Sequence, residues 1–150
     1  MKPILKKKHE RGQSLVELAI SLLVLLYLLS GVVEFGIAFF QFIQLRDAAQ
    51  EGALYGSINP TDTNGIISRV RNASDEPIDL ADTTLVTVNV TVTGTACAGS
   101  ALSVDVGFNH VIFMPFISRL IGAQNNTPPN TIPLTGSVTD TILRPACPLP

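Results

Sequence analysis

The sequence lacks the motifs by which the commonest enzyme classes are recognised. It contains no glycine-rich phosphate-binding loop, no CxxC pair and no two histidines spaced as ligands of one metal ion. Serine, histidine and aspartate are all present, but no pattern brings them together as a catalytic group. We therefore predict that the protein is not an enzyme and that it uses neither a metal ion nor another cofactor.

Charge is nearly absent from one long stretch of the chain. Between Arg11 and Arg46, the only side chains expected to carry charge are Glu17 and Glu34. The 16 residues between these glutamates would form about 24 Å of helix, and apolar flanks extend the run toward the roughly 20 residues that a bilayer core requires. We predict a single transmembrane helix over about residues 15–38, in contact with membrane lipid. Each glutamate can reach toward water at one end of the span, and we assign Glu34 no further role.

The charged residues that precede this apolar run are mostly basic. Residues 1–12 carry a net charge of +4 and residues 13–150 carry −6, which together give the −2 of the whole chain. Basic residues that precede a membrane helix stay in the cytoplasm, so the C-terminal part is expected outside. Its acidity argues against binding nucleic acid, which requires a basic surface. His9 and His110 would then lie on opposite sides of the membrane and cannot share a metal ion.

The long helix is predicted to continue beyond the membrane. We expect one helix over residues 13–57, because only glycines interrupt its helix-forming residues. Its last part, residues 45–57, has an apolar face of mostly small residues at helical spacing, namely Leu45, Ala48, Ala49, Gly52 and Ala53. Small residues on one face indicate close packing against another element.

Residues 58–150 are predicted to form an extracytoplasmic head, which gives an α+β fold overall. A short amphipathic helix is expected in "GIISRVRNA", and strands are expected in "TTLVTVNVTVTG", "ALSVDVGF" and "TIPLTGSVTDTIL". Because each strand alternates apolar and polar residues, we predict an antiparallel sheet of about three to four strands, covered on one face by the helix extension. The segment "VIFMPFISRLIG" is too short for a second span and is expected to form a packed loop and a short helix.

The two cysteines, Cys97 and Cys147, both fall in the part that is expected outside the cytoplasm. An oxidising compartment favours a disulfide between them. Two free thiols remain the alternative, because a single pair of cysteines carries no spacing signature.

The N-terminal region differs from an ordinary secretory signal. Such a signal has a small-residue cleavage site after its apolar core, whereas here the core is followed by more helix and no A-x-A pattern. Gly12 instead precedes the core, directly after the basic residues. The order "KKKHERG" then "QSLVE" resembles the class III signal of type IV pilins and pseudopilins.

That resemblance implies a cleavage site and a role for one carboxylate. A prepilin peptidase would cut between Gly12 and Gln13, so that residues 1–12 are a basic leader peptide and Gln13 carries the new α-amine. Glu17 would lie one helical turn away and pair with this amine, or with that of a neighbouring subunit, in a water-free helix bundle. The alternative is that Glu17 only interacts with the dipole of the helix's first turn.

The pattern is also similar to that of one pseudopilin family. Val16-Glu17, Glu34-Phe35-Gly36 and the segment 48–53, "AAQEGA", resemble the TadE-like family of the Tad (Flp) pilus system, and the tail from Leu102 to Arg144 is similar to its looser C-terminal pattern. Leu18 and Leu23 stand where many members have phenylalanine and proline.

The TadE resemblance implies a minor subunit of a Tad pilus or related secretion machine. Its partners would be the peptidase, other pilin subunits and the pilus assembly platform, and it would reside in the cytoplasmic membrane or a surface pilus. An unprocessed signal-anchored envelope protein with an outer ligand-binding domain is the alternative. A membrane-tethered enzyme is disfavoured by the missing motifs.

Overall fold

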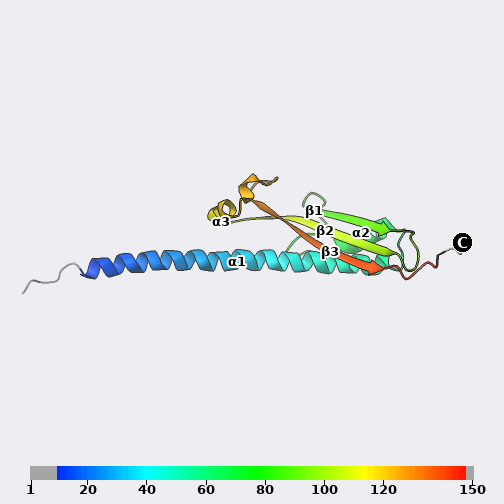
Figure 1. The fold of residues 1–150 in the computed structure, drawn as a ribbon, viewed down its shortest axis with the longest axis horizontal. Coiled ribbons are helices and arrows are strands. Elements are labelled where there is room, and N and C mark those ends of the chain that lie inside the picture. Colours follow the sequence, from blue (N-terminus) through cyan, green and yellow to red (C-terminus); the bar gives the residue numbers. More distant parts are fainter. Residues whose placement is uncertain (1–9, 148–150) are drawn as a thin grey trace, which may run out of the picture.

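The computed structural model of the protein describes residues 10–147. One helix of 47 residues, α1 (Glu10–Gly56), runs along most of the molecule, and a small head packs on its C-terminal half while the N-terminal half stands free (Figure 1). The predicted α+β fold with a long N-terminal helix is therefore confirmed.

The head contains a single antiparallel sheet in the order β1-β2-β3. After α1, the elements are α2 (Thr63–Arg71), β1 (Val86–Thr93), β2 (Ala101–Val111), α3 (Pro115–Leu120), the 3-10 turn η1 (Ala123–Asn125) and β3 (Thr131–Thr141). The three predicted strands are all present. The second extends beyond the predicted pattern, because pairing with β3 continues through His110↔Ile132 and Val111↔Thr131.

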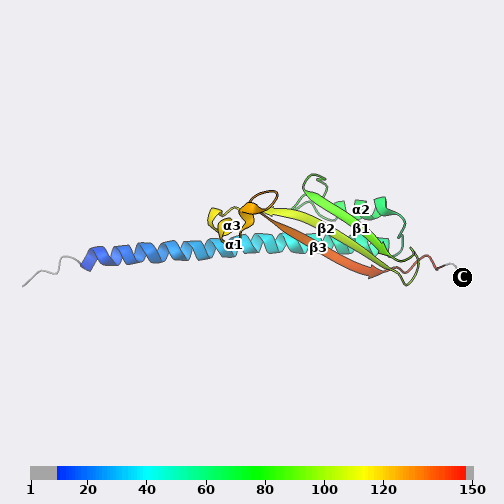
Figure 2. The same cartoon turned by 45° about the horizontal axis from the view of Figure 1, so that its top comes forward.

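One face of the sheet packs against α1, which contacts β2 and β3 along its C-terminal half (Figures 1 and 2). The register places valines opposite one another on this face, as in the row formed by Val90, Val104 and Val138. Because side chains alternate along a strand, most of the polar residues of the three strands lie on the opposite face, whereas His110 of β2 is buried on the inward one. Helix α2 contacts both α1 and β1 and supplies the buried Ile66 and Val70 to the same core.

Small residues on α1 let the sheet approach the helix backbone. Leu45, Ala48, Ala49 and Ala53 are fully buried, as the amphipathic pattern predicts. On the opposing strand, a Cβ added to Gly136 would lie 2.5 Å from the backbone nitrogen of Arg46. Strand β3 therefore crosses α1 at a distance that leaves no space for a side chain.

The far end of the head is closed by a disulfide. Cys97, in the turn between β1 and β2, is bonded to Cys147 in the C-terminal tail, and their Cα atoms are 4.9 Å apart. The predicted disulfide is thus present. The tail is also tied to the end of α1, because the backbone N–H of Leu143 donates to the carbonyl of Ser57 at 2.7 Å. A crosslink that spans 50 residues contributes about 4 kcal/mol in the chain-entropy account.

Replacing Gly136 by alanine should destabilise the head. The added methyl group meets backbone atoms rather than a movable side chain, so β3 or α1 must shift, and such overpacking typically costs roughly 1–3 kcal/mol. Amide hydrogen exchange of β2 and β3 in the full chain in detergent should accelerate accordingly. Gly36→Ala is the matched control, because a Cβ there meets nothing within 4 Å. If both variants exchange like the wild type, the crossing is looser than described.

Candidate functional site

The free half of α1 carries the residues that the sequence places near a processing site. Every side chain from Gly12 to Leu29 is exposed, and most of them are large and apolar. By length and composition, α1 could cross a membrane. A helix that is apolar on all sides is stable only where lipid or other helices cover it.

Gln13 and Glu17 lie on the same side of this free half. The Gln13 Nε2 donates a hydrogen bond to Glu17 Oε1 at 3.3 Å, and both side chains are exposed. Seven described helical residues, 10–16, precede Glu17, so this carboxylate is not in the first helical turn of the full-length chain. Gly12 is equally open, because a Cβ there would meet nothing within 4 Å.

Glu34 does not reach toward water, and its interpretation as a simple flanking group is wrong. Only 8% of this residue is exposed, because the head covers it. Its Oε1 accepts a hydrogen bond from the backbone N–H of Phe113 at 3.2 Å and lies 3.0 Å from Nε2 of His110. His110 is itself 1% exposed, and its Nδ1 lies 2.6 Å from Oε1 of Gln41. We refer to Glu34, Gln41 and His110 as the junction network.

The junction network joins α1 to the end of β2 through buried polar groups. Both ring nitrogens of His110 face oxygen atoms. Each of these contacts is within hydrogen-bond distance, so the buried ring is held between a side chain of α1 on either side. Removing one member of such a network leaves a buried polar group without its hydrogen-bond partner, which costs about 1–3 kcal/mol. The network therefore fixes the position of the head on the helix.

A second polar attachment lies further along α1. The side-chain amide of Gln44 donates to the carbonyl of Ile78 at 2.7 Å, and its oxygen accepts from the N–H of Ile78 at 2.9 Å. These paired bonds hold the segment after α2 against the helix. Sequence analysis identified neither Gln44 nor the junction network. One available signal was the alternation of β2, which places His110 on the inward face with Leu102, Val104 and Val106.

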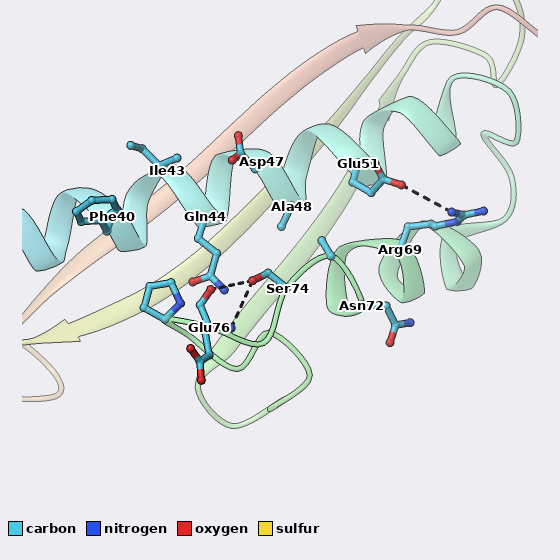
Figure 3. A pocket seen from close by; sticks show the side chains of 12 residues that line it. Phe40, Ile43, Gln44, Asp47, Ala48, Glu51, Arg69, Asn72, Ser74 and Glu76 are labelled. Atoms are coloured by element: carbon cyan, nitrogen blue, oxygen red, sulfur yellow. Dashed lines mark hydrogen bonds and ion pairs between the residues drawn. The ribbon is translucent and has the colours of Figure 1, made fainter.

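An open groove separates α1 from α2 and the segment that follows it (Figure 3). The two walls are joined by an exposed ion pair between Arg69 and Glu51, whose N–O distance is 3.7 Å. The groove offers polar and apolar contacts but no arrangement of catalytic groups. Within residues 10–147, no group of three or more histidine, cysteine, aspartate or glutamate side chains could hold a metal ion.

Asp62 fixes the start of α2. Its carboxylate accepts from the backbone N–H of Gly65 at 2.9 Å and from the hydroxyl of Tyr55 at 2.8 Å. Both bonds lower the pKa of Asp62, and the bond from Gly65 has the larger effect. The hydrogen bond between Tyr55 and Asp62 also raises the pKa of Tyr55. The stabilisation by Asp62 is therefore present above its unfolded-state pKa and is lost as pH falls through its lower folded-state pKa.

The sequence of the long helix decides which family the chain resembles. A sequence model described as TadE-like protein matches residues 12–54. This helical segment is TadE-like. The match includes Gly12, Glu17 and Glu34, so the resemblance drawn from the motifs is confirmed. No curated protein and no solved structure matches the chain. The sheet lies beyond the matched residues, so the TadE-like match describes the helix and not the head.

Replacing His110 by leucine should weaken the attachment of the head to the TadE-like helix. Among the described residues, Glu34 would keep the N–H of Phe113 as a partner but lose its hydrogen bond with His110. A loss of about 1–3 kcal/mol is expected, measured as faster amide exchange in β2 and β3 of the full chain in detergent.

The double variant Glu34→Leu/His110→Leu should cost less than the sum of the two single variants, because it removes both partners of the buried hydrogen bond together. Glu51→Gln is the control, since its exposed ion pair with Arg69 is expected to contribute only about 0–1 kcal/mol. Additive effects of the two junction substitutions would contradict a coupled pair.

Proposed function

We propose that the protein is a TadE-like pseudopilin, a minor structural or assembly subunit of a Tad (Flp) pilus or related secretion machine. A prepilin peptidase cuts between Gly12 and Gln13, and the free half of α1 spans the cytoplasmic membrane with the head outside. The observation that carries this proposal is the TadE-like match over a helix whose first half is apolar and uncovered. TadE-like proteins are generally structural, in keeping with a role in assembly rather than catalysis.

The surroundings of Gly12 support a processing site at this position. A side chain there would contact nothing in the chain itself, so packing within the protein does not require glycine. A peptidase that accommodates only a small residue next to the cut would require it. The five basic residues among residues 1–12 support the cytoplasmic placement of this end.

The position of Glu17 supports a role after cleavage. Cleavage at Gly12 places a charged α-amine on Gln13, one turn from Glu17 on the same side of the helix. When helices pack together without lipid or water between them, that amine needs a carboxylate partner. Glu17 supplies it, to its own chain or to a neighbour.

The alternative function is an unprocessed signal-anchored envelope protein whose head binds a ligand. The groove between α1 and α2 is the observation that favours it, because its walls combine apolar and charged side chains (Figure 3). The mass of the mature protein distinguishes the two. Loss of residues 1–12 supports the pseudopilin, whereas an intact N-terminus supports the anchored binding protein.

Gly12→Arg should abolish processing. A large charged side chain next to the cut would not fit a peptidase site shaped for glycine, so mass spectrometry of membranes from a host that expresses the peptidase should find only the full-length chain. Gly36→Ala, a substitution at another open position of α1, should mature normally. A mature Gly12→Arg variant would show that the cleavage site is elsewhere.

Glu17→Gln should separate processing from assembly. The variant should insert and mature like the wild type, but it should be lost from sheared filaments or purified assembly complexes. Losing a buried pair costs about 3–5 kcal/mol, which corresponds to a reduction of at least a hundredfold in the assembly equilibrium. Glu51→Gln, at an exposed position in the C-terminal half of α1, is the matched control.

The state of the new N-terminus must be measured in the same samples, because Gln13 can cyclise and lose its charge. Normal assembly of Glu17→Gln with an uncyclised, charged amine would contradict the pairing role.

A further inference from the structure

The short helix α3 packs beside the middle of α1, at the end of the head that faces the free half of the helix (Figures 1 and 2). The side chain of Ile117 lies 3.9 Å from the position that a Cβ on Gly31 would occupy. Ser30 and Gly31 are also the first residues of α1 that lose part of their exposure, since all side chains from Gly12 to Leu29 are exposed. The head therefore begins at the level of Gly31.

The length of the free half sets the height of α3 above a membrane. Gly31 lies 19 positions beyond Gly12, which corresponds to about 28 Å of helix. The hydrocarbon core of a bilayer is about 30 Å thick. If the free half crosses the membrane, α3 consequently lies at the outer surface of the lipid and not well above it.

The surface of α3 and its flanks is unusually apolar for the exterior of a head. Phe113, Leu120 and Ile121 are exposed by 72%, 86% and 52%. Leu120 is more exposed than any large apolar residue on the free half of α1. These three exposed side chains lie within nine residues of one another in the chain, and large apolar side chains exposed in one region are candidates for an interaction surface.

Charge is distributed in keeping with a lipid partner. Residues 111–130 contain no aspartate or glutamate, although the outer part of the chain is acidic as a whole. Arg119 is the only charged residue in this segment, and it is exposed beside Leu120. An arginine can place its stem along apolar side chains and its guanidinium among headgroup phosphates.

We propose that Phe113, Leu120 and Ile121 insert into the outer interface of the same bilayer that α1 crosses. This inference rests on the proposed anchoring of the protein by α1. The contact is continuous with that span, and three side chains on or next to one short helix fall short of the roughly 20–30 residues that each partner contributes to a stable protein interface. The protein then contacts the membrane both through the span of α1 and through the segment around α3, and the second contact restricts the rotation and tilt of the head.

Single tryptophans can test the contact directly, because the natural sequence contains none. Leu120→Trp is the probe, and its exposure means that the substitution disturbs no packing. Leu23→Trp reports on the centre of the span, and Leu143→Trp reports on an exposed site at the far end of the head. Each full-length variant is reconstituted at low density into phosphatidylethanolamine–phosphatidylglycerol vesicles that carry quenchers either near the headgroups or deep in the acyl chains.

We expect Leu120→Trp to show blue-shifted emission and stronger quenching by the headgroup-level quencher, whereas Leu23→Trp should respond to the deep quencher and Leu143→Trp to neither. If Leu23→Trp is quenched but Leu120→Trp behaves like Leu143→Trp, the lipid contact is refuted while the anchoring by α1 stands. If Leu23→Trp is not quenched, the anchoring fails and the inference fails with it. A blue shift of Leu120→Trp that appears only at high protein density, without quenching by lipid, would assign this surface to a second copy of the chain and refute the lipid contact.

Discussion

The contact between the sheet and the small-residue face of α1 is the interaction on which the rest of the structure depends. A sheet with one apolar face must bury that face against another element. Here the cover is not a separate helix but the continuation of the free, apolar half of α1. The buried face of the helix consists mostly of alanines, namely Ala48, Ala49 and Ala53, next to Leu45. The strand that crosses it has a glycine, Gly136, where a side chain would meet the helix backbone. The head is therefore built directly on the same continuous helix whose first half is uncovered.

The junction network lies at the point where this helix changes its surroundings. On one side of Gly31 the side chains of α1 are exposed, and a few residues further on Glu34 is enclosed by the head. A carboxylate at such a boundary would normally point into water. Enclosing it with His110 and the N–H of Phe113 instead makes a carboxyl group part of the contact between the head and the helix. In the proposed pseudopilin, the same helix carries Glu17 for contacts between subunits and Glu34 for contacts within one.

Local periodicity was sufficient to predict most of the fold. The alternating valines predicted strand β1, and the helical spacing of alanines predicted the C-terminal half of α1. Both patterns involve residues close in sequence, and both elements are present in the structure. The junction network could not be predicted in this way, because Glu34 and His110 are 76 residues apart and meet only when the register of β2 and its crossing over α1 are fixed. The same holds for the pairing of Gln44 with Ile78. Gly12, Gln13 and Glu17 came from a motif rather than from packing, and the structure adds only that they are open and that Gln13 and Glu17 share one side of the helix.

The disulfide at the far end of the head has a mechanical consequence. A force applied between the end of α1 and the C-terminal tail would have to extend the 90 residues from Ser57 to Cys147, about 310 Å of fully extended chain, if no crosslink were present. The bond between Cys97 and Cys147 carries the load past β2, α3 and β3, so only the 40 residues from Ser57 to Cys97 can be drawn out, about 140 Å. The two longest strands, including the one that carries His110, are thereby shielded from tension between these two points.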